Sequence, residues 1–239
     1  MTVPDFLPSL SAGAHDADNG EACVMEYVAL LAGEAWSDRP ECTHPLLAHE
    51  ARMTNDLLRD SDRSRLVPLI GRLFGTGDDS PELRARLRIA QARQVIALIE
   101  PSSRGVAVRA VEEAELWLGR EGDREDVERA FAETRSLPRT TGDLDPDHTE
   151  FHLMAARIFP FVMSPELEPA EAFALKALVV AHLTAASGEC RADCGNGPAR
   201  GRRMVKDLAG LIDVYDEVMG RTETSLTPED VRELAQSVY

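Results

Sequence analysis

The sequence predicts an all-α protein with about ten helices in a globular, bundle-like array and no sheet. Ala, Leu, Glu and Arg, which are strong helix formers, are abundant, whereas β-branched residues are few outside short Val/Ile pairs. Apolar residues recur at helical spacing in the long segments, and no segment shows the two-residue alternation of a half-buried strand. Several segments also begin with a capping residue followed by proline, as helices do.

The first half of the chain is expected to hold an irregular arm followed by six helices. The arm, 1–19, contains two prolines and a run of small polar residues. Breaker segments at 37–40 and 75–79 separate the helices that follow the arm. The clearest helix start is Ser80-Pro81, an N-cap with proline at the first helical position. The expected helices span about 20–34, 45–57, 63–73, 81–99, 105–118 and 124–134.

The second half is expected to hold four helices after the longest interior loop, 136–144. One runs from Asp145 to about Phe159, and a short final helix begins at Thr227. The helix at 169–186 is apolar nearly all round and is therefore predicted to be central and buried. Another spans 198–219.

The long loop at 136–144 also suggests a boundary between two helical regions. The predicted division is an N-terminal region, 1–135, and a C-terminal region, 145–239, packed as one globular unit. The N-terminal region contains a Cys/His/Glu-rich unit at 13–50.

The composition restricts the partners and the compartment. With 42 acidic and 26 basic residues the formal net charge is -16, which disfavours binding to duplex nucleic acid. The acidic surface could simply keep the protein soluble, attract a basic partner or mimic nucleic acid. No export signal is visible, and charged residues interrupt the most apolar stretch, so no membrane segment is expected. We therefore expect a cytoplasmic protein whose four cysteines are thiols or metal ligands.

The Cys/His/Glu-rich unit is the first candidate site. The eight steps from Glu34 to Cys42 reach roughly 26 Å when extended, enough to return the chain to Cys23. His15, Cys23, Cys42 and His44 could then form a metal site, and zinc is the cofactor that two Cys and two His would take. Their spacing is not that of a standard zinc motif, and the alternative is a buried Cys23 with solvent-exposed histidines.

Two carboxylates in the same unit are candidate catalytic residues, Glu26 and Asp38. The residues three and four positions from Glu26 are all apolar, so its carboxylate needs a partner or a raised pKa. Glu26 could act as a general acid, a general base or a metal ligand. The favoured interpretation is a pair with Arg39 or Arg52.

This region also resembles a family of uncharacterised actinobacterial and actinophage hypothetical proteins. Over about 13–76 the chain matches the pattern G-x-C-x-M-E, then L-A-G-E, then S-D-x-P-x-C, and a helix with W/T-N-D, here Thr54-Asn55-Asp56. The resemblance implies that five residues belong together, and it implies no activity. These residues are Cys23, Glu26, Glu34, Asp38 and Cys42.

A Gly-rich loop before a basic helix start is the second candidate site. Free N–H groups and the helix dipole favour an anion there, with Gly195, Gly197, Arg202 and Arg203 as the binding residues. The loop lacks the G-K-[ST] ending of a phosphate-binding P-loop. The alternative is a flexible loop whose arginines offset the negative charge of the acidic surface. A site joining all four cysteines is a further alternative.

Three histidines in the second half raise weaker hypotheses. His148 and His152 lie four residues apart on an expected helix, a spacing that can hold a metal, although a solvated helix start is the favoured interpretation. His182, on the expected buried helix, is predicted to be a hydrogen-bonded core histidine.

Three functions remain open on the sequence alone. The first is a soluble helical interaction module for an unknown protein or small ligand, because no nucleophile elbow, dinucleotide fingerprint or Walker loop is present. The second is an enzyme with a site between the Cys23/Glu26/Asp38/Cys42 unit and the Gly-rich loop 195–203. The third is an acidic decoy that mimics nucleic acid.

Overall fold

The computed structural model describes residues 8–136, 152–153, 155, 166–187, 190 and 198–222. They fall into two compact units, each described by itself. Unit 1 comprises Met1–Asp79 and Gly197–Tyr239, and unit 2 comprises Ser80–Asn196. This grouping divides the chain at 79/80 and 196/197. The loop proposed as a boundary, 136–144, lies outside the described residues except for residue 136.

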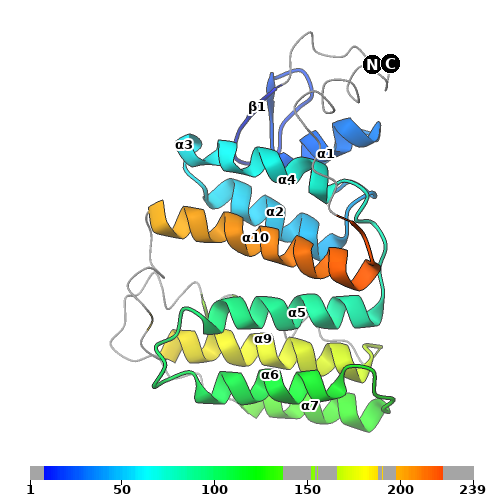
Figure 1. Ribbon diagram of the computed structural model, residues 1–239, viewed down its shortest axis with the longest axis vertical. Helices are drawn as coiled ribbons and strands as arrows, with labels where there is room; N and C mark the ends of the chain where they lie inside the picture. Colours follow the sequence, from blue (N-terminus) through cyan, green and yellow to red (C-terminus); the bar gives the residue numbers. More distant parts are fainter. Residues whose placement is uncertain are drawn as a thin grey trace. The chain divides into compact units, whose positions relative to one another are not determined.

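Unit 1 is a helical layer that carries a small parallel sheet near the N-terminal end of the chain (Figure 1). Helix α2 packs against α1 and α10, and α1 packs against α4. Residues far apart in the sequence therefore share one core. Its elements are β1 (Ser9–Leu10), β2 (Glu21–Ala22), α1 (Val24–Ala32), α2 (Pro45–Leu57), α3 (Asp60–Arg63), a 3-10 turn (Ser64–Leu66), α4 (Val67–Leu73) and α10 (Pro198–Met219).

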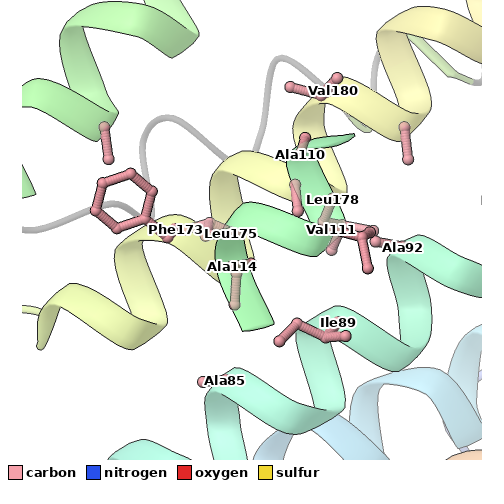
Figure 2. Close-up of a cluster of buried hydrophobic side chains, with 14 of the residues drawn as sticks. Ala85, Ile89, Ala92, Ala110, Val111, Ala114, Phe173, Leu175, Leu178 and Val180 are labelled. Atoms are coloured by element: carbon pink, nitrogen blue, oxygen red, sulfur yellow. The ribbon is translucent and has the colours of Figure 1, made fainter. Parts of the chain in front are cut away.

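Unit 2 is built around one central helix, α9 (Pro169–Ser187), as the sequence predicts. Helices α5 (Pro81–Ile96), α6 (Gly105–Trp117) and α7 (Arg124–Ser136) each pack against it. Their apolar side chains form one core, part of which Figure 2 shows. Twelve consecutive residues of α9, 171–182, are buried, which explains why this helix is apolar on every face.

The charged residues of α9 are compatible with burial because each has a partner from another helix of unit 2. Glu171 accepts a hydrogen bond from Arg84 Nε at 2.5 Å. Lys176 donates to Glu113 Oε2 at 2.7 Å and also to Glu133. By length and composition α9 could cross a membrane, but 78 % of its most apolar window is buried inside the folded unit, as in a core helix.

The helical class is confirmed, but the prediction that the chain has no sheet is wrong. Strands β1 and β2 pair in parallel, with Ser9 opposite Glu21 and Leu10 opposite Ala22. Strands of two residues are too short to show an alternating pattern, so periodicity could not have revealed them. The helix expected from Gly20 begins at Val24 because the preceding residues belong to β2. The helices expected at 145–159 and after Thr227 lie largely or wholly outside the described residues.

Candidate functional site

The candidate site is built on the first turn of α1, which a capping box closes. Cys23, the N-cap, accepts a hydrogen bond from Glu26 N through its sulfur at 3.4 Å. In return Glu26 Oε2 accepts one from Cys23 N at 2.6 Å. Two main-chain donors of the helix start are therefore satisfied, in a position usually taken by serine or threonine.

Glu26 also binds the segment that precedes the helix. We call residues 8–20, which include β1 and the loop after it, the arm. Glu26 Oε1 accepts a hydrogen bond from His15 N at 2.7 Å, and Oε2 lies 3.1 Å from His15 Nδ1. The Glu26 residue is only 1 % exposed. Its carboxylate is accommodated in the core because main-chain donors and a histidine ring surround it.

The predicted pairing of Glu26 with an arginine is therefore wrong. Arg52 instead donates through Nη1 to the carbonyl of Asp38 at 2.8 Å, and its Nε lies 3.6 Å from Asp38 Oδ2. Arg39 lies 3.9 Å from the same carboxylate. Asp38, the second candidate catalytic residue, thus contacts two arginines. The helical spacing of the neighbours of Glu26 on α1 could not reveal that its partner comes from the arm.

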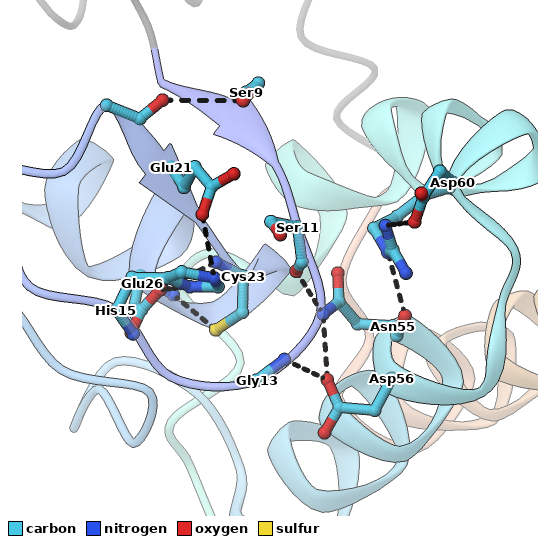
Figure 3. A network of polar contacts seen from close by, with 12 residues as sticks. Ser9, Ser11, Gly13, His15, Glu21, Cys23, Glu26, Asn55, Asp56 and Asp60 are labelled. Atoms are coloured by element: carbon cyan, nitrogen blue, oxygen red, sulfur yellow. Dashed lines mark hydrogen bonds and ion pairs between the residues drawn. The ribbon is translucent and has the colours of Figure 1, made fainter.

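Four further side chains bind the arm, and each contacts a main-chain atom (Figure 3 shows two of these bonds). Asn55 Nδ2 donates to Ser11 O at 2.8 Å, and Asp56 Oδ1 accepts from Gly13 N at 2.8 Å. Trp36 Nε1 donates to His15 O at 2.6 Å. Tyr27 donates to the carbonyl of Pro8. We call the five side chains that bind the arm the arm-binding surface; they are Glu26, Tyr27, Trp36, Asn55 and Asp56.

The strand pairing adds further main-chain bonds to the arm. Ser9 N donates to Gly20 O at 3.0 Å, and Ser11 N donates to Ala22 O at 2.9 Å. The arm is therefore held through its main chain by β2, α1, α2 and Trp36. The sequence offered no role for Tyr27 or Trp36, and Asn55 and Asp56 stood out only because the resemblance includes them.

The four residues of the proposed zinc site are not gathered as a ligand set. In the part of the chain that the structure describes, no group of three or more His, Cys, Asp or Glu side chains is placed to hold a metal ion. His44 caps α2 by accepting from Leu46 N at 3.2 Å and lies 2.9 Å from Asp79 Oδ1 through Nε2. Glu34 accepts from Cys42 N at 2.8 Å. His15 and Cys23 belong to the network of Glu26 described above.

Burial keeps both described thiols of this region neutral. It raises the pKa of Cys23 to about 12, and the neighbouring Glu26 charge acts in the same direction. Burial also raises the pKa of Cys42. Since the thiolate is the nucleophile, neither cysteine is activated for nucleophilic chemistry at neutral pH.

The proposed anion site cannot be assembled from the described residues. Gly195 and Gly197 lie outside them, and only the helix that follows is described. On that helix Arg202 is exposed, and Arg203 Nε lies 3.8 Å from Asp207 Oδ2. The anion site stays a prediction.

A buried histidine pair lies in unit 2. His152 Nδ1 lies 2.9 Å from His182 Nδ1, and the two residues are 2 % and 7 % exposed. The prediction of a hydrogen-bonded core histidine is confirmed for His182. The favoured interpretation of His152 as part of a solvated helix start is wrong, and His148 lies outside the described residues.

This pair predicts a loss of stability in mild acid. Burial, and secondarily the charge of His152, lower the pKa of His182 from 6.5 to about 3. Between these values the unfolded chain binds a proton that the folded chain does not, so unfolding becomes easier as the pH falls below about 6.5. One such proton changes the free energy of unfolding by about 1.4 kcal/mol for each pH unit.

The measurement is urea unfolding of the full chain and of His182→Gln at several pH values from 7 to 4. Carboxylates contribute to the pH dependence of both proteins, so the difference between them isolates the histidine. We expect the variant to lose less stability on acidification than the unmodified chain. Equal slopes would show that His182 takes up its proton without unfolding.

Comparison with protein-family models, with curated proteins and with solved structures found no match. The resemblance over 13–76 therefore stays a prediction.

Proposed function

We propose that the protein is a helical interaction module that binds a polypeptide segment through the arm-binding surface of unit 1. One observation carries this proposal: five side chains contact main-chain groups of a single segment, as described above. Recognition of main-chain groups is a common way for proteins to bind peptides. The arm occupies this surface within its own chain, which supports a polypeptide as the class of ligand.

The contacts also indicate the shape of the ligand. The main-chain atoms bound by α1, α2 and Trp36 include Ser11 O, Gly13 N, His15 N and His15 O. Between them the chain bends at residues 12 and 13, where Gly13 has a φ of 89° that other residues rarely adopt. The residues at 11–14 are Ser, Ala, Gly and Ala, so the fitting segment is one of small side chains.

The alternative of an enzyme has one arrangement in its favour, the His15–Glu26 pair. A carboxylate that orients a histidine is a feature of general-base sites. The His15 side chain is only 9 % exposed, and its Nε2 lies 3.8 Å from Glu21 Oε2. Glu26 is engaged by the main chain of two residues, and the thiol of Cys23 is neutral at physiological pH. We therefore rank this function second.

A peptide selection on the full chain tests the proposal. The chain would carry Gly13→Pro, which removes the N–H that Asp56 binds and cannot adopt the φ of 89° found at Gly13. This change should free the surface from the arm. We expect displayed peptides of small residues to be enriched, with Trp36 fluorescence changing when they bind.

The control variants decide where these peptides bind. Adding Asp56→Ala should weaken them at least about tenfold, the effect of losing one hydrogen bond to a charged group. Adding Glu112→Ala, which removes an exposed carboxylate of unit 2, should leave binding unchanged. Failure to enrich any peptide, or peptides insensitive to Asp56→Ala, would refute the proposed function.

A further inference from the structure

We propose that the arm of a second copy can replace the arm within the chain, so that two copies exchange arms and form a symmetric dimer. The inference rests on the proposed function and names the occupant. The arm is the one segment whose fit to this surface the structure shows, and a second copy presents the same segment. Reciprocal exchange satisfies both surfaces and closes the assembly at two chains.

The last five residues of the arm, 16–20, lie just before β2 and are suited to act as a hinge. Residues 16–19 are exposed and polar or small, and Gly20 has a φ of 68°, which other residues rarely adopt. A main-chain hydrogen bond from Asn19 N to Asp16 O, 3.0 Å long, closes the turn, and Ser9 Oγ contacts Gly20 O at 3.4 Å. Straightening the hinge therefore disturbs few contacts.

The bonds that hold the arm would be the same in both arrangements. The five arm-binding side chains and β2 contact atoms at 8–15, all of which lie before the hinge. The two arrangements differ in whether the arm and the surface that it occupies belong to the same chain. Within one chain, a short tether gives the arm an effective concentration on the order of 1 mM at the surface. The unmodified chain should therefore exchange arms only at high protein concentration.

Charge gives the association a recognisable salt dependence. Each copy carries a formal net charge of -16, so two copies repel each other. Salt screens this repulsion, with a Debye length of about 10 Å at 0.1 M falling to about 3 Å at 1 M. Dimerisation should consequently increase with ionic strength, the opposite of an association driven by complementary charges.

A complementation experiment with two full-length variants tests the exchange. The first carries Gly13→Pro and has a defective arm with an intact surface. The second carries Trp36→Phe and Asp56→Ala and has an intact arm with a defective surface, since both changes remove a bond to the arm. Each variant alone should sediment as a monomer, and a mixture should form a one-to-one heterodimer at concentrations well below ~1 mM.

A second mixture controls for association through another surface. When Gly13→Pro is added to the second variant, both arms are defective and the heterodimer should disappear. A first mixture that stays monomeric, or a heterodimer that survives this control, would overturn the exchange. Peptides selected as described above would still bind in either case if the interaction module is correct, so the two proposals can fail separately.

The unmodified chain provides a test that does not depend on the folding of any variant. Sedimentation at about 1 mM protein should show a dimer whose fraction rises between 0.1 and 1 M salt. A monomer throughout this range would also overturn the proposal.

Discussion

Leu178→Asp should unfold unit 2. Leu178 lies midway along α9 and is 1 % exposed, with α5, α6 and α7 packed around its helix. The change removes a buried leucine, which costs about 2–5 kcal/mol, and adds a buried carboxylate that lacks a hydrogen-bonding or charged partner. Since a domain is stable by only about 5–15 kcal/mol, the sum is comparable to its whole stability.

Far-UV circular dichroism and the thermal midpoint check this expectation. Leu116→Asp is the matched control, because Leu116 lies on α6 of the same unit and is 59 % exposed. The control should shift the thermal midpoint by only a few degrees, as surface substitutions usually do. A Leu178→Asp protein with an unchanged midpoint would mean that α9 is not the centre of unit 2.

Glu26→Ala should give the second largest loss, centred on unit 1. The change leaves the N–H groups of Cys23 and His15 without their acceptor and removes the partner of the His15 ring. Each buried donor left unpaired costs about 1–3 kcal/mol, so we expect the two to cost about 2–6 kcal/mol in urea unfolding. Glu26→Gln should lose less, because its amide oxygen can still accept one of these bonds.

The control for this change is another carboxylate near the same histidine. Glu21 is exposed, and its Oε2 lies 3.8 Å from His15 Nε2. Glu21→Ala should therefore cost less than about 1 kcal/mol, the usual upper value for an exposed ion pair. Equal losses for the two alanine variants would show that Glu26 does not hold the arm.

The helices could be predicted because their signals are local. Ser80 caps α5 by accepting from Leu83 N at 3.1 Å, as the Ser-Pro start suggests. The apolar residues that recur at helical spacing on this helix are buried, namely Ala85, Ile89, Ala92 and Ile96, as is Ile99 three residues beyond its end. Helix α9 was expected to be central because it is apolar all round. In each case residues within a few turns of one another determine the result.

The candidate site could be predicted only in part because its contacts are not local. The apolar residues three and four positions from Glu26 indicated that its carboxylate needs a partner, but the partner is an arm residue, His15, that lies before the helix. Asn55 and Asp56 bind the arm across more than forty residues of sequence, through main-chain groups that every residue type except proline carries. A residue pattern does not encode such contacts. The same holds for His152, whose burial depends on His182 thirty residues later.

The central claim is that side chains of unit 1 hold the main chain of the arm, and amide hydrogen exchange on the full chain tests it most directly. The N–H groups of Gly13 and His15 donate to Asp56 and Glu26, whereas those of the exposed residues 16–18 donate no hydrogen bond that the structure shows. We expect Gly13 and His15 to exchange at least about tenfold more slowly than residues 16–18, after correction for intrinsic rates. Exchange at the same rate along the whole arm would contradict the account.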